Sequence, residues 1–405
     1  MATPSITMIP SGYKADKVYS VLPTNGDGDL TFDRNDTGTR VNKSGLIEQV
    51  STDVPRLDYS DGSCPSLLLE PTSLNLATYS QDFSDTSWSK GSSTVTVNQT
   101  TAPSGDLTAD KFISTGTVQP RVERSFTVPS TNTTFTYSVF VKKINTPYVA
   151  IASYDGSDNP FVIFNLDTKS VVSSNSEGSS IKEMSNGWFR ISMTQTVLST
   201  DTFNLWKILN CTALSAFTGV IGDESFIWGA QLEAKSFATS YMPTSSQTQS
   251  RSADSALKTG LSSYINQTAG VLYGEFAALS NEDDTYRVFS LSDGTGSDVG
   301  RVFIGFKDTN QIYAYLGATS LGSFTPTDAT TFNKVAIKYE NNNSKLFVNG
   351  VQIGAINTTA TVPSGLSRLG LDSGNGGSKF HVKARDIRVY NTVLTDAELT
   401  TLTTI

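Results

Sequence analysis

Apolar and polar residues alternate along most of this chain in short runs that end in Gly, Asn, Asp or Ser. Such period-two alternation is typical of strands, and a sustained 3.6-residue period, which would indicate a helix, is almost absent. The pattern therefore predicts an all-β protein made of antiparallel sandwiches or jelly rolls. Clear examples of expected strands are residues 135–141, 149–154, 188–193 and 334–339.

The density of apolar residues divides the chain into four segments. Residues 1–73 have too few apolar side chains to build a core, so we expect an anchoring and oligomerisation segment that is ordered by docking onto another copy or another protein. Residues 74–243 and 266–405 each carry enough apolar residues for one β-sandwich. Residues 244–265 between them are typical of a linker.

One hairpin can be registered residue by residue. Strands at 302–306 and 312–316 alternate, and pairing Phe306 with Ile312 gives one wholly apolar face. The opposite face then carries an aromatic group around Gly305, which consists of Phe303, Tyr313 and Tyr315.

Two local signals predict a turn and a helix near the end of the chain. Asn349 and Gly350 supply the positive φ angles of a two-residue type I′ hairpin turn. Thr395 and Glu398 have the spacing of a capping box, so we expect a short helix that starts at Thr395.

Charge and apolar content exclude several classes of partner. The chain has 30 basic and 38 acidic residues, a net charge of −8, and no basic stripe that could follow a phosphate backbone. Nucleic acid is therefore not an expected partner. No apolar run approaches the roughly 18 residues that span a bilayer, so membrane insertion is not expected either. The first residues also lack the basic and apolar blocks of a signal peptide.

The residue types that usually carry chemistry are scarce. Cys64 and Cys211 lie far apart in the sequence, which indicates buried thiols, and His381 is the single histidine. These counts leave carboxylates as the remaining catalytic groups, and no E-x-D-x-x-E or G-x-S-x-G pattern is present. We therefore expect a protein that is not an enzyme, with no catalytic residue, no bound metal and no cofactor.

One stretch has the oxygen-ligand spacing of a calcium loop. Leu30 stands where such a loop has its glycine, so the favoured interpretation is an ordinary turn that leads into a strand. The residues with that spacing are Asn25, Asp27, Asp29, Thr31, Asp33 and Asp36.

Aromatic residues are the other candidates for binding, because their rings stack on the apolar faces of sugars. Three tryptophans lie in strand patterns and are expected in the core, whereas the face of Trp206 is ambiguous. The three core candidates are Trp88, Trp188 and Trp228.

The preferred glycan site is the aromatic group of Phe303, Tyr313 and Tyr315, with a shallow dish above Gly305. Asp284 and Tyr286 lie in a polar loop that could supply hydrogen bonds or hold a metal, but a solvated loop is the favoured interpretation. The alternative is that this face is the inner one or is covered by a neighbouring subunit, since aromatic residues also pair across strands for stability alone.

Three sets of motifs resemble known families. Residues 27–34, 39–42, 45–48, 54–59 and 64–71 resemble the N-terminal region of many bacteriophage virion proteins. Residues 75–83, Trp88, 187–190 and 228–233 resemble their jelly-roll module, which is similar to carbohydrate-binding modules. Residues 347–350, 386–390 and 394–399 resemble a concanavalin A-like, laminin-G-type lectin domain.

The resemblance implies a phage tail or head fibre or appendage, exposed on the virion surface and commonly a homotrimer. Its N-terminal segment would bind sister chains or other virion proteins, and its jelly-roll and concanavalin A-like sandwiches would bind host polysaccharide. Two alternatives stay open: a purely structural capsid decoration or fibre spacer, and a polysaccharide depolymerase. The sequence leaves the host, the sugar, the attachment point and the copy number open.

Overall fold

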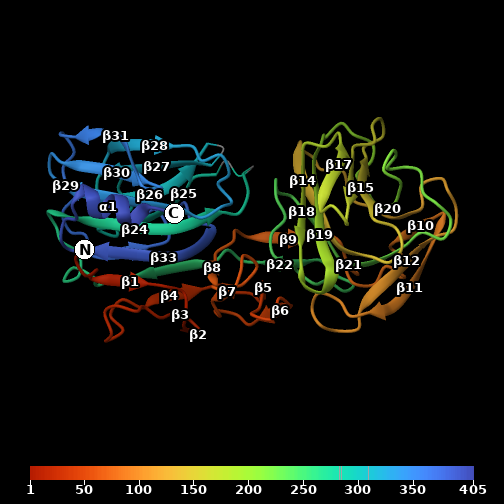
Figure 1. Cartoon of the computed structure of the whole chain (residues 1–405), viewed down its shortest axis with the longest axis horizontal. Coiled ribbons are helices and arrows are strands. Elements are labelled where there is room, and N and C mark those ends of the chain that lie inside the picture. Colours follow the sequence, from red (N-terminus) through yellow and green to blue (C-terminus); the bar gives the residue numbers. More distant parts are fainter. Residues whose placement is uncertain (282, 284, 309) are drawn as a thin grey trace. The chain divides into compact units, whose positions relative to one another are not determined.

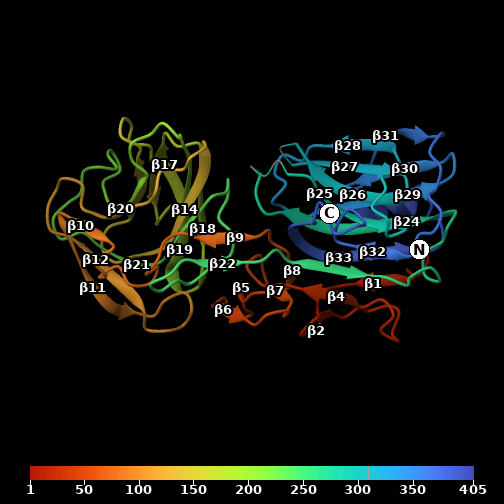
Figure 2. The same cartoon turned by 180° about the vertical axis from the view of Figure 1, so that it is seen from behind.

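The computed structural model describes residues 1–281, 283, 285–308 and 310–405, and their regular structure is almost entirely antiparallel β-strand (Figures 1 and 2). The all-β prediction is confirmed. Contacts along the chain divide it into two compact units. Unit 1 comprises Met1–Arg40, Gln49–Thr72 and Ser252–Ile405, and unit 2 comprises Val41–Glu48 and Ser73–Arg251.

Unit 1 is a sandwich of two sheets, which have eight and nine strands among the described residues. The eight-stranded sheet has the spatial order β31 (Val351–Asn357), β30 (Ser344–Val348), β29 (Asn333–Glu340), β24 (Ala269–Ala278), β33 (Val382–Tyr390), β8 (Ser66–Leu68) and β7 (Arg56–Asp58), and β1 (Ile6–Met8) also pairs with β33. The nine-stranded sheet has the order β2 (Tyr13–Lys14), β3 (Lys17–Val18), β4 (Leu30–Asp33), β23 (Ser255–Lys258), β32 (Arg368–Gly370), β25 (Arg287–Ser292), β26 (Arg301–Lys307), β27 (Gln311–Leu316) and β28 (Thr319–Phe324).

The N-terminal segment is part of unit 1. Ile6 of β1 is paired with Val389 of β33, and Phe32 of β4 with Ala256 of β23. Figure 1 shows the red strand β1 beside the blue β33. Ile6 and Phe32 are buried in the same apolar core as the strands of the C-terminal part, so the segment fills a place in this sandwich.

The division of the chain therefore differs from the predicted one. Residues 1–73 dock mainly onto the C-terminal part of their own chain, and the expected linker 244–265 contains β22 (Gln249–Arg251) and β23, each paired in a sheet. The physical reason is the core: few apolar side chains are enough when they complete a sandwich that the rest of the chain supplies. The anchoring role of the segment stays a prediction.

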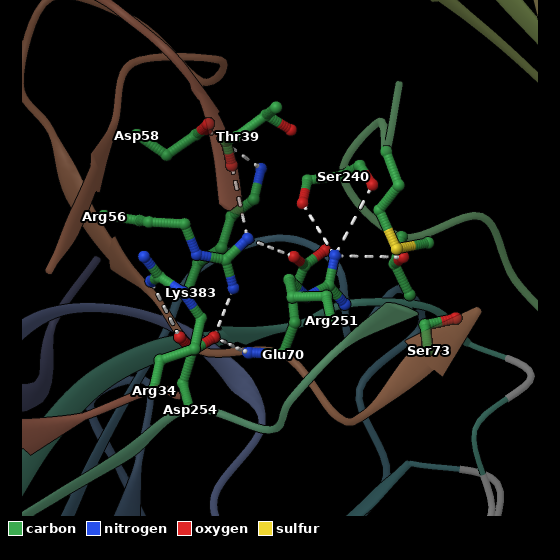
Figure 3. Close-up of polar contacts among 12 residues, drawn as sticks. Arg34, Thr39, Arg56, Asp58, Glu70, Ser73, Ser240, Arg251, Asp254 and Lys383 are labelled. Carbon is green, nitrogen blue, oxygen red and sulfur yellow. Dashed lines mark hydrogen bonds and ion pairs between the residues drawn. The ribbon is translucent and has the colours of Figure 1, made fainter. Parts of the chain in front are cut away.

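A buried cluster of four charged side chains fastens the N-terminal strands inside unit 1 (Figure 3). Arg56 forms ion pairs with both Glu70 and Asp254, and Arg34 Nη1 lies 3.3 Å from Asp254 Oδ1. Asp254 also accepts a hydrogen bond of 2.7 Å from the backbone N–H of Glu70. Although burial lowers the pKa of Arg56, the negative charges of Asp254 and Glu70 raise it above its usual value. Two positive and two negative charges thus balance in the interior.

We expect Asp254→Asn to destabilise unit 1 by about 3–5 kcal/mol, because it leaves buried guanidinium charge without its partner. The four tryptophans lie in unit 2, so the measurement is hydrogen exchange of β4, β7 and β23 peptides under increasing urea. Asp308→Asn is the matched control, since Asp308 is 67% exposed and its pair with Lys307 is worth less than about 1 kcal/mol. Equal unfolding curves for the two variants would contradict the assignment.

Unit 2 is a second sandwich, whose two main sheets have six strands each. One sheet has the order β10 (Ser89–Gly91), β13 (Arg121–Ser125), β20 (Leu205–Asn210), β15 (Tyr148–Tyr154), β16 (Phe161–Asn165) and β17 (Ser170–Ser174). The other has the order β11 (Ser93–Thr100), β12 (Ala109–Ser114), β21 (Glu224–Glu233), β14 (Thr133–Lys143), β19 (Trp188–Val197) and β18 (Gly178–Glu183). The smaller pairs are β9 (Ser73–Asn75) with β22, and β5 (Gly38–Val41) with β6 (Ile47–Val50).

The tryptophans are structural. Trp88, Trp188 and Trp228 are at most 1% exposed, which confirms the prediction of core positions. Trp206, whose face the sequence left ambiguous, is also fully buried; its ring stacks on Tyr137 at 5.8 Å and its indole N–H donates to Asn204. These rings therefore stabilise unit 2 and are not available to a ligand.

The predicted turn and helix are confirmed. Asn349 and Gly350 have φ angles of 49° and 83° and join β30 to β31 with Val348 opposite Val351. Helix α1 (Asp396–Thr403) begins after Thr395 with the complete capping box. No helix within the described residues is long and apolar enough to cross a membrane.

Asp110 of unit 2 is a buried carboxyl group that favours its protonated form. It is 1% exposed and accepts hydrogen bonds from the backbone N–H groups of Phe83 and Asn98, at 2.9 and 3.0 Å. Burial raises the pKa of Asp110 to about 6, although the two hydrogen bonds lower it in part. The folded-state pKa is thus above the ordinary value of 3.8.

Because the folded-state pKa is raised, the contribution of Asp110 to stability is complete below about pH 4 and is lost as the pH rises through about 6. We expect the stability of the wild type relative to Asp110→Asn to fall across this interval and to be flat above it. The loss of one hydrogen-bond acceptor in the variant is a pH-independent offset. Tryptophan fluorescence during urea unfolding measures unit 2 alone, and a difference independent of pH would refute the expectation.

Candidate functional site

The candidate aromatic group lies on the outer face of the nine-stranded sheet of unit 1. β26 and β27 pair with Phe306 opposite Ile312 and Phe303 opposite Tyr315, which confirms the predicted register. Val302, Ile304 and their partners on β27 belong to the core between the two sheets, so the aromatic face is the one directed away from the core. The alternative that it is the inner face is therefore wrong.

The aromatic side chains pack closely against one another. The rings of Phe303 and Tyr315 are stacked, with centroids 5.2 Å apart and planes 2° from parallel. Tyr313 meets Phe303 edge-on at 5.5 Å. Phe303 and Tyr313 are only 5% and 6% exposed, whereas Tyr315 is half-buried, so Tyr315 offers more ring surface to a ligand.

Tyr286 completes the group from the segment just before β25. Its ring meets Tyr313 edge-on at 6.2 Å, and its side chain is 57% exposed. Asp284, the remaining predicted site residue, lies outside the described residues. The structure thus brings together four of the five predicted residues: Phe303, Tyr313, Tyr315 and Tyr286.

The space above Gly305 is filled, which corrects the expected dish. A Cβ atom at this position would lie 2.4 Å from the backbone oxygen of Arg287, 2.5 Å from a methyl carbon of Val288 and 3.0 Å from the ring of Tyr313. The glycine therefore permits close packing of β25, β26 and the aromatic group. Any ligand must bind on top of the rings and not between them.

Two cations flank the aromatic group. The guanidinium carbon of Arg301 lies 4.6 Å from the ring centroid of Phe303, and Lys307 Nζ lies 5.4 Å from that of Tyr313. Arg301 also donates a hydrogen bond of 2.7 Å to the backbone oxygen of Ser373. Burial raises the pKa of the Tyr313 hydroxyl well above its usual value, although Arg301 lowers it in part. The hydroxyl is thus a neutral hydrogen-bonding group at physiological pH.

The sequence did not identify Val288 or Arg301 as members of this face. Val288 lies opposite Gly305 on β25, and Arg301 precedes Phe303 by two residues on the same strand, so it shares its face. The period-two pattern of β26 was the signal that could have found Arg301. Val288 could be identified only from the pairing of β25 with β26, and no turn motif in the sequence predicts that pairing.

The acidic residues with calcium-loop spacing do not converge. Asp27 accepts hydrogen bonds from Asn25 and Tyr264, Asp29 from Ser20, and Asp36 from the backbone of Ser252. Residues 24–28 form a turn before β4, as the favoured interpretation predicted. Within the described part of the chain, no group of three or more His, Cys, Asp or Glu side chains could hold a metal ion.

Residues 276–400, which lie in unit 1, match the family model described as the Concanavalin A-like lectin/glucanases superfamily. Unit 1 thus contains a lectin-like domain. No curated protein matches the chain.

Solved structures of low identity align with parts of the chain. The CBM40 of the Ruminococcus gnavus IT-sialidase bound to alpha2,3 sialyllactose is 19% identical, with a TM-score of 0.29 over 34% of this chain and 84% of that chain. Domain 4 of a GH43 extracellular arabinanase from Geobacillus stearothermophilus, in complex with arabinotriose, is 13% identical, with a TM-score of 0.29 over 37% and 73% of the two chains. Trypanosoma rangeli sialidase with the inhibitor DANA is 11% identical, with a TM-score of 0.30 over 65% and 52%.

We expect Gly305→Ala to destabilise unit 1 by several kcal/mol, because its Cβ meets backbone atoms of β25 that cannot move aside. Gly12→Ala is the control: its Cβ would meet only the ring of Tyr19, at 3.3 Å. Far-UV circular dichroism during urea unfolding compares the two. A Gly305→Ala protein as stable as the control would show that the space above the glycine is open after all.

Proposed function

We propose that this protein is a non-enzymatic bacteriophage fibre or appendage subunit, exposed on the virion surface, whose unit 1 binds glycans of the host. The family match of residues 276–400 supports a lectin-like domain. The virion motifs of the N-terminal segment support the phage assignment by resemblance, as set out above.

The observation that carries the glycan-binding role is the aromatic face of unit 1. Tyr286 packs against Tyr313, and Tyr315 packs against Phe303. Tyr286 and Tyr315 both expose ring surface, and Arg301 lies at the margin of the group. Buried Phe303 and Tyr313 fix the two outer rings, so little conformational freedom is lost when a sugar stacks on them. Tyrosine hydroxyls and a guanidinium offer hydrogen bonds to sugar hydroxyl groups.

An oligomer would strengthen such a site, since several weak contacts on one particle raise avidity without new interactions. We place the contacts with sister chains or other virion proteins at the N-terminal end of the nine-stranded sheet. β2 is the terminal strand there, and Ile9, Tyr19 and Val21 in the same segment are 41–45% exposed. A sheet edge with exposed apolar side chains suits pairing with another chain.

The second candidate function is a purely structural spacer in the capsid or fibre. The close packing of Phe303 and Tyr313 favours it, because two rings with 5% and 6% exposure stabilise the sheet whether or not a ligand is present. The two functions make different predictions for variants that lack only the exposed rings: a glycan binder loses affinity, whereas a spacer has no binding to lose.

We expect Tyr286→Ala and Tyr315→Ala each to weaken glycan binding by about tenfold, which corresponds to about 1.4 kcal/mol, because each removes one stacking surface. The measurement is binding of the purified full chain to an array of bacterial surface polysaccharides. Val351→Ala is the control, as Val351 is a 60% exposed side chain of β31 in the eight-stranded sheet of unit 1 and belongs neither to this face nor to the proposed contact with sister chains. Thermal unfolding checks that the Tyr315 variant keeps its fold.

A wild-type protein that binds no polysaccharide at multivalent density would favour the spacer. The same holds if a protein with both Tyr286→Ala and Tyr315→Ala binds as well as the wild type.

A further inference from the structure

Unit 2 carries a lysine in an unusual position on its β10-to-β17 sheet. In β20, Trp206 and Ile208 face the core of the sandwich, so the alternate residues Lys207 and Leu209 face outward. Lys207 is nevertheless only 6% exposed. Its neighbours across the sheet are Glu123 on β13 and Ala152 on β15.

The Lys207 ammonium has aromatic neighbours and no bonded partner. Nζ lies 5.6 Å from the ring centroid of Tyr154 and 5.9 Å from that of Phe217. Every residue of unit 2 is described, and none of them forms a hydrogen bond or ion pair with this ammonium. Because an ammonium has three donors, such burial is costly unless another group supplies the acceptors. The Nζ atom is nevertheless not wholly enclosed, so an acceptor group of a ligand can reach it.

The charges around Lys207 leave a surplus of one positive charge. Glu123 is the nearest opposite charge, but Arg121 Nε donates a hydrogen bond of 2.7 Å to its carboxylate. Burial lowers the pKa of Lys207, Glu123 raises it in part, and Arg121 adds to the lowering. The site therefore contains two cations and one carboxylate, and one further anion would balance it.

Aromatic rings surround this position. Tyr154 packs on Phe203 with ring centroids 5.4 Å apart, and Phe203 is 49% exposed. Phe217, the second ring near Lys207, meets Phe161 edge-on with ring centroids 5.7 Å apart. Rings of this kind stack on the apolar faces of pyranoses and do little for a free inorganic anion.

We infer that Lys207 is the anchor of a second glycan site, which binds a carboxylate-bearing sugar of an acidic polysaccharide with its ring against Tyr154 and Phe217. The inference rests on the proposed glycan-binding function and names the class of sugar. A carboxylate matches the single surplus charge, whereas a phosphate monoester would bring up to two negative charges.

The test uses the purified full chain and an array of polysaccharides that contain uronic or sialic acid, each printed beside its carboxyl-reduced form. We expect the wild type to prefer the acidic forms. Lys207→Met should reduce this preference at least tenfold, because it keeps the length of the side chain and removes the charge. Glu123→Gln should increase the affinity several-fold, because it removes the carboxylate that competes with the ligand and frees Arg121.

Lys111→Met is the control, since Lys111 belongs to unit 2, is 27% exposed and already pairs with Glu224 at 3.2 Å. Its binding should equal that of the wild type. Lys207→Met should unfold at the same temperature as the wild type or higher, since it removes an unpaired buried charge.

Equal binding of acidic and reduced forms by the wild type, or an unchanged preference in Lys207→Met, would overturn the inference. Either result is distinct from failure of the proposed function, in which the wild type binds no polysaccharide of either form. If the acid preference were lost in Tyr286→Ala and kept in Lys207→Met, the acidic sugar would belong to unit 1 and the inference would again be wrong.

Discussion

Unit 1 depends on the buried ion cluster in which Asp254 connects Arg34 and Arg56. Isolated charges at this depth would oppose folding, but two guanidinium groups and two carboxylates cancel there. Arg34, Arg56 and Glu70 lie in the N-terminal segment, whereas Asp254 follows Glu70 by 184 residues. Their geometry is satisfied only when the N-terminal strands take their places beside β23 and β33, and the cluster thus selects one arrangement of strands among the many that apolar packing alone would tolerate.

The outward faces of the two units combine aromatic rings and cations in different ways. In unit 1, stacked rings cover an apolar sheet surface and leave the cations Arg301 and Lys307 at its margin. In unit 2, rings enclose a cation, Lys207, and its charge is left unbalanced. Arg301 and Lys307 are paired with Asp298 and Asp308, whereas Lys207 has no such partner. Under the proposed function, the second surface would therefore favour acidic sugars more strongly than the first.

What the sequence could predict was local. The register of β26 and β27, the Asn349–Gly350 turn and the cap at Thr395 depend on residues a few positions apart, and the structure confirms each. The partner of the N-terminal segment could not be predicted, because Phe32 meets Ala256 across more than 200 residues. The filled space above Gly305 and the burial of Lys207 could not be predicted for the same reason. Val288 packs against Gly305 from another strand, and Phe217 packs against Lys207 from outside β20.

Most of unit 2 lies in the sequence between two parts of unit 1, and this order has a consequence for biosynthesis. On the ribosome, β1, β4, β7 and β8 emerge before β23 and β33 exist. At roughly 5–20 residues per second, translation of Ser73–Arg251 takes on the order of 10–40 s, during which unit 2 can fold while the earlier strands wait without partners. The low apolar content of residues 1–73 as a whole would limit aggregation of this nascent segment until its partner strands are synthesised.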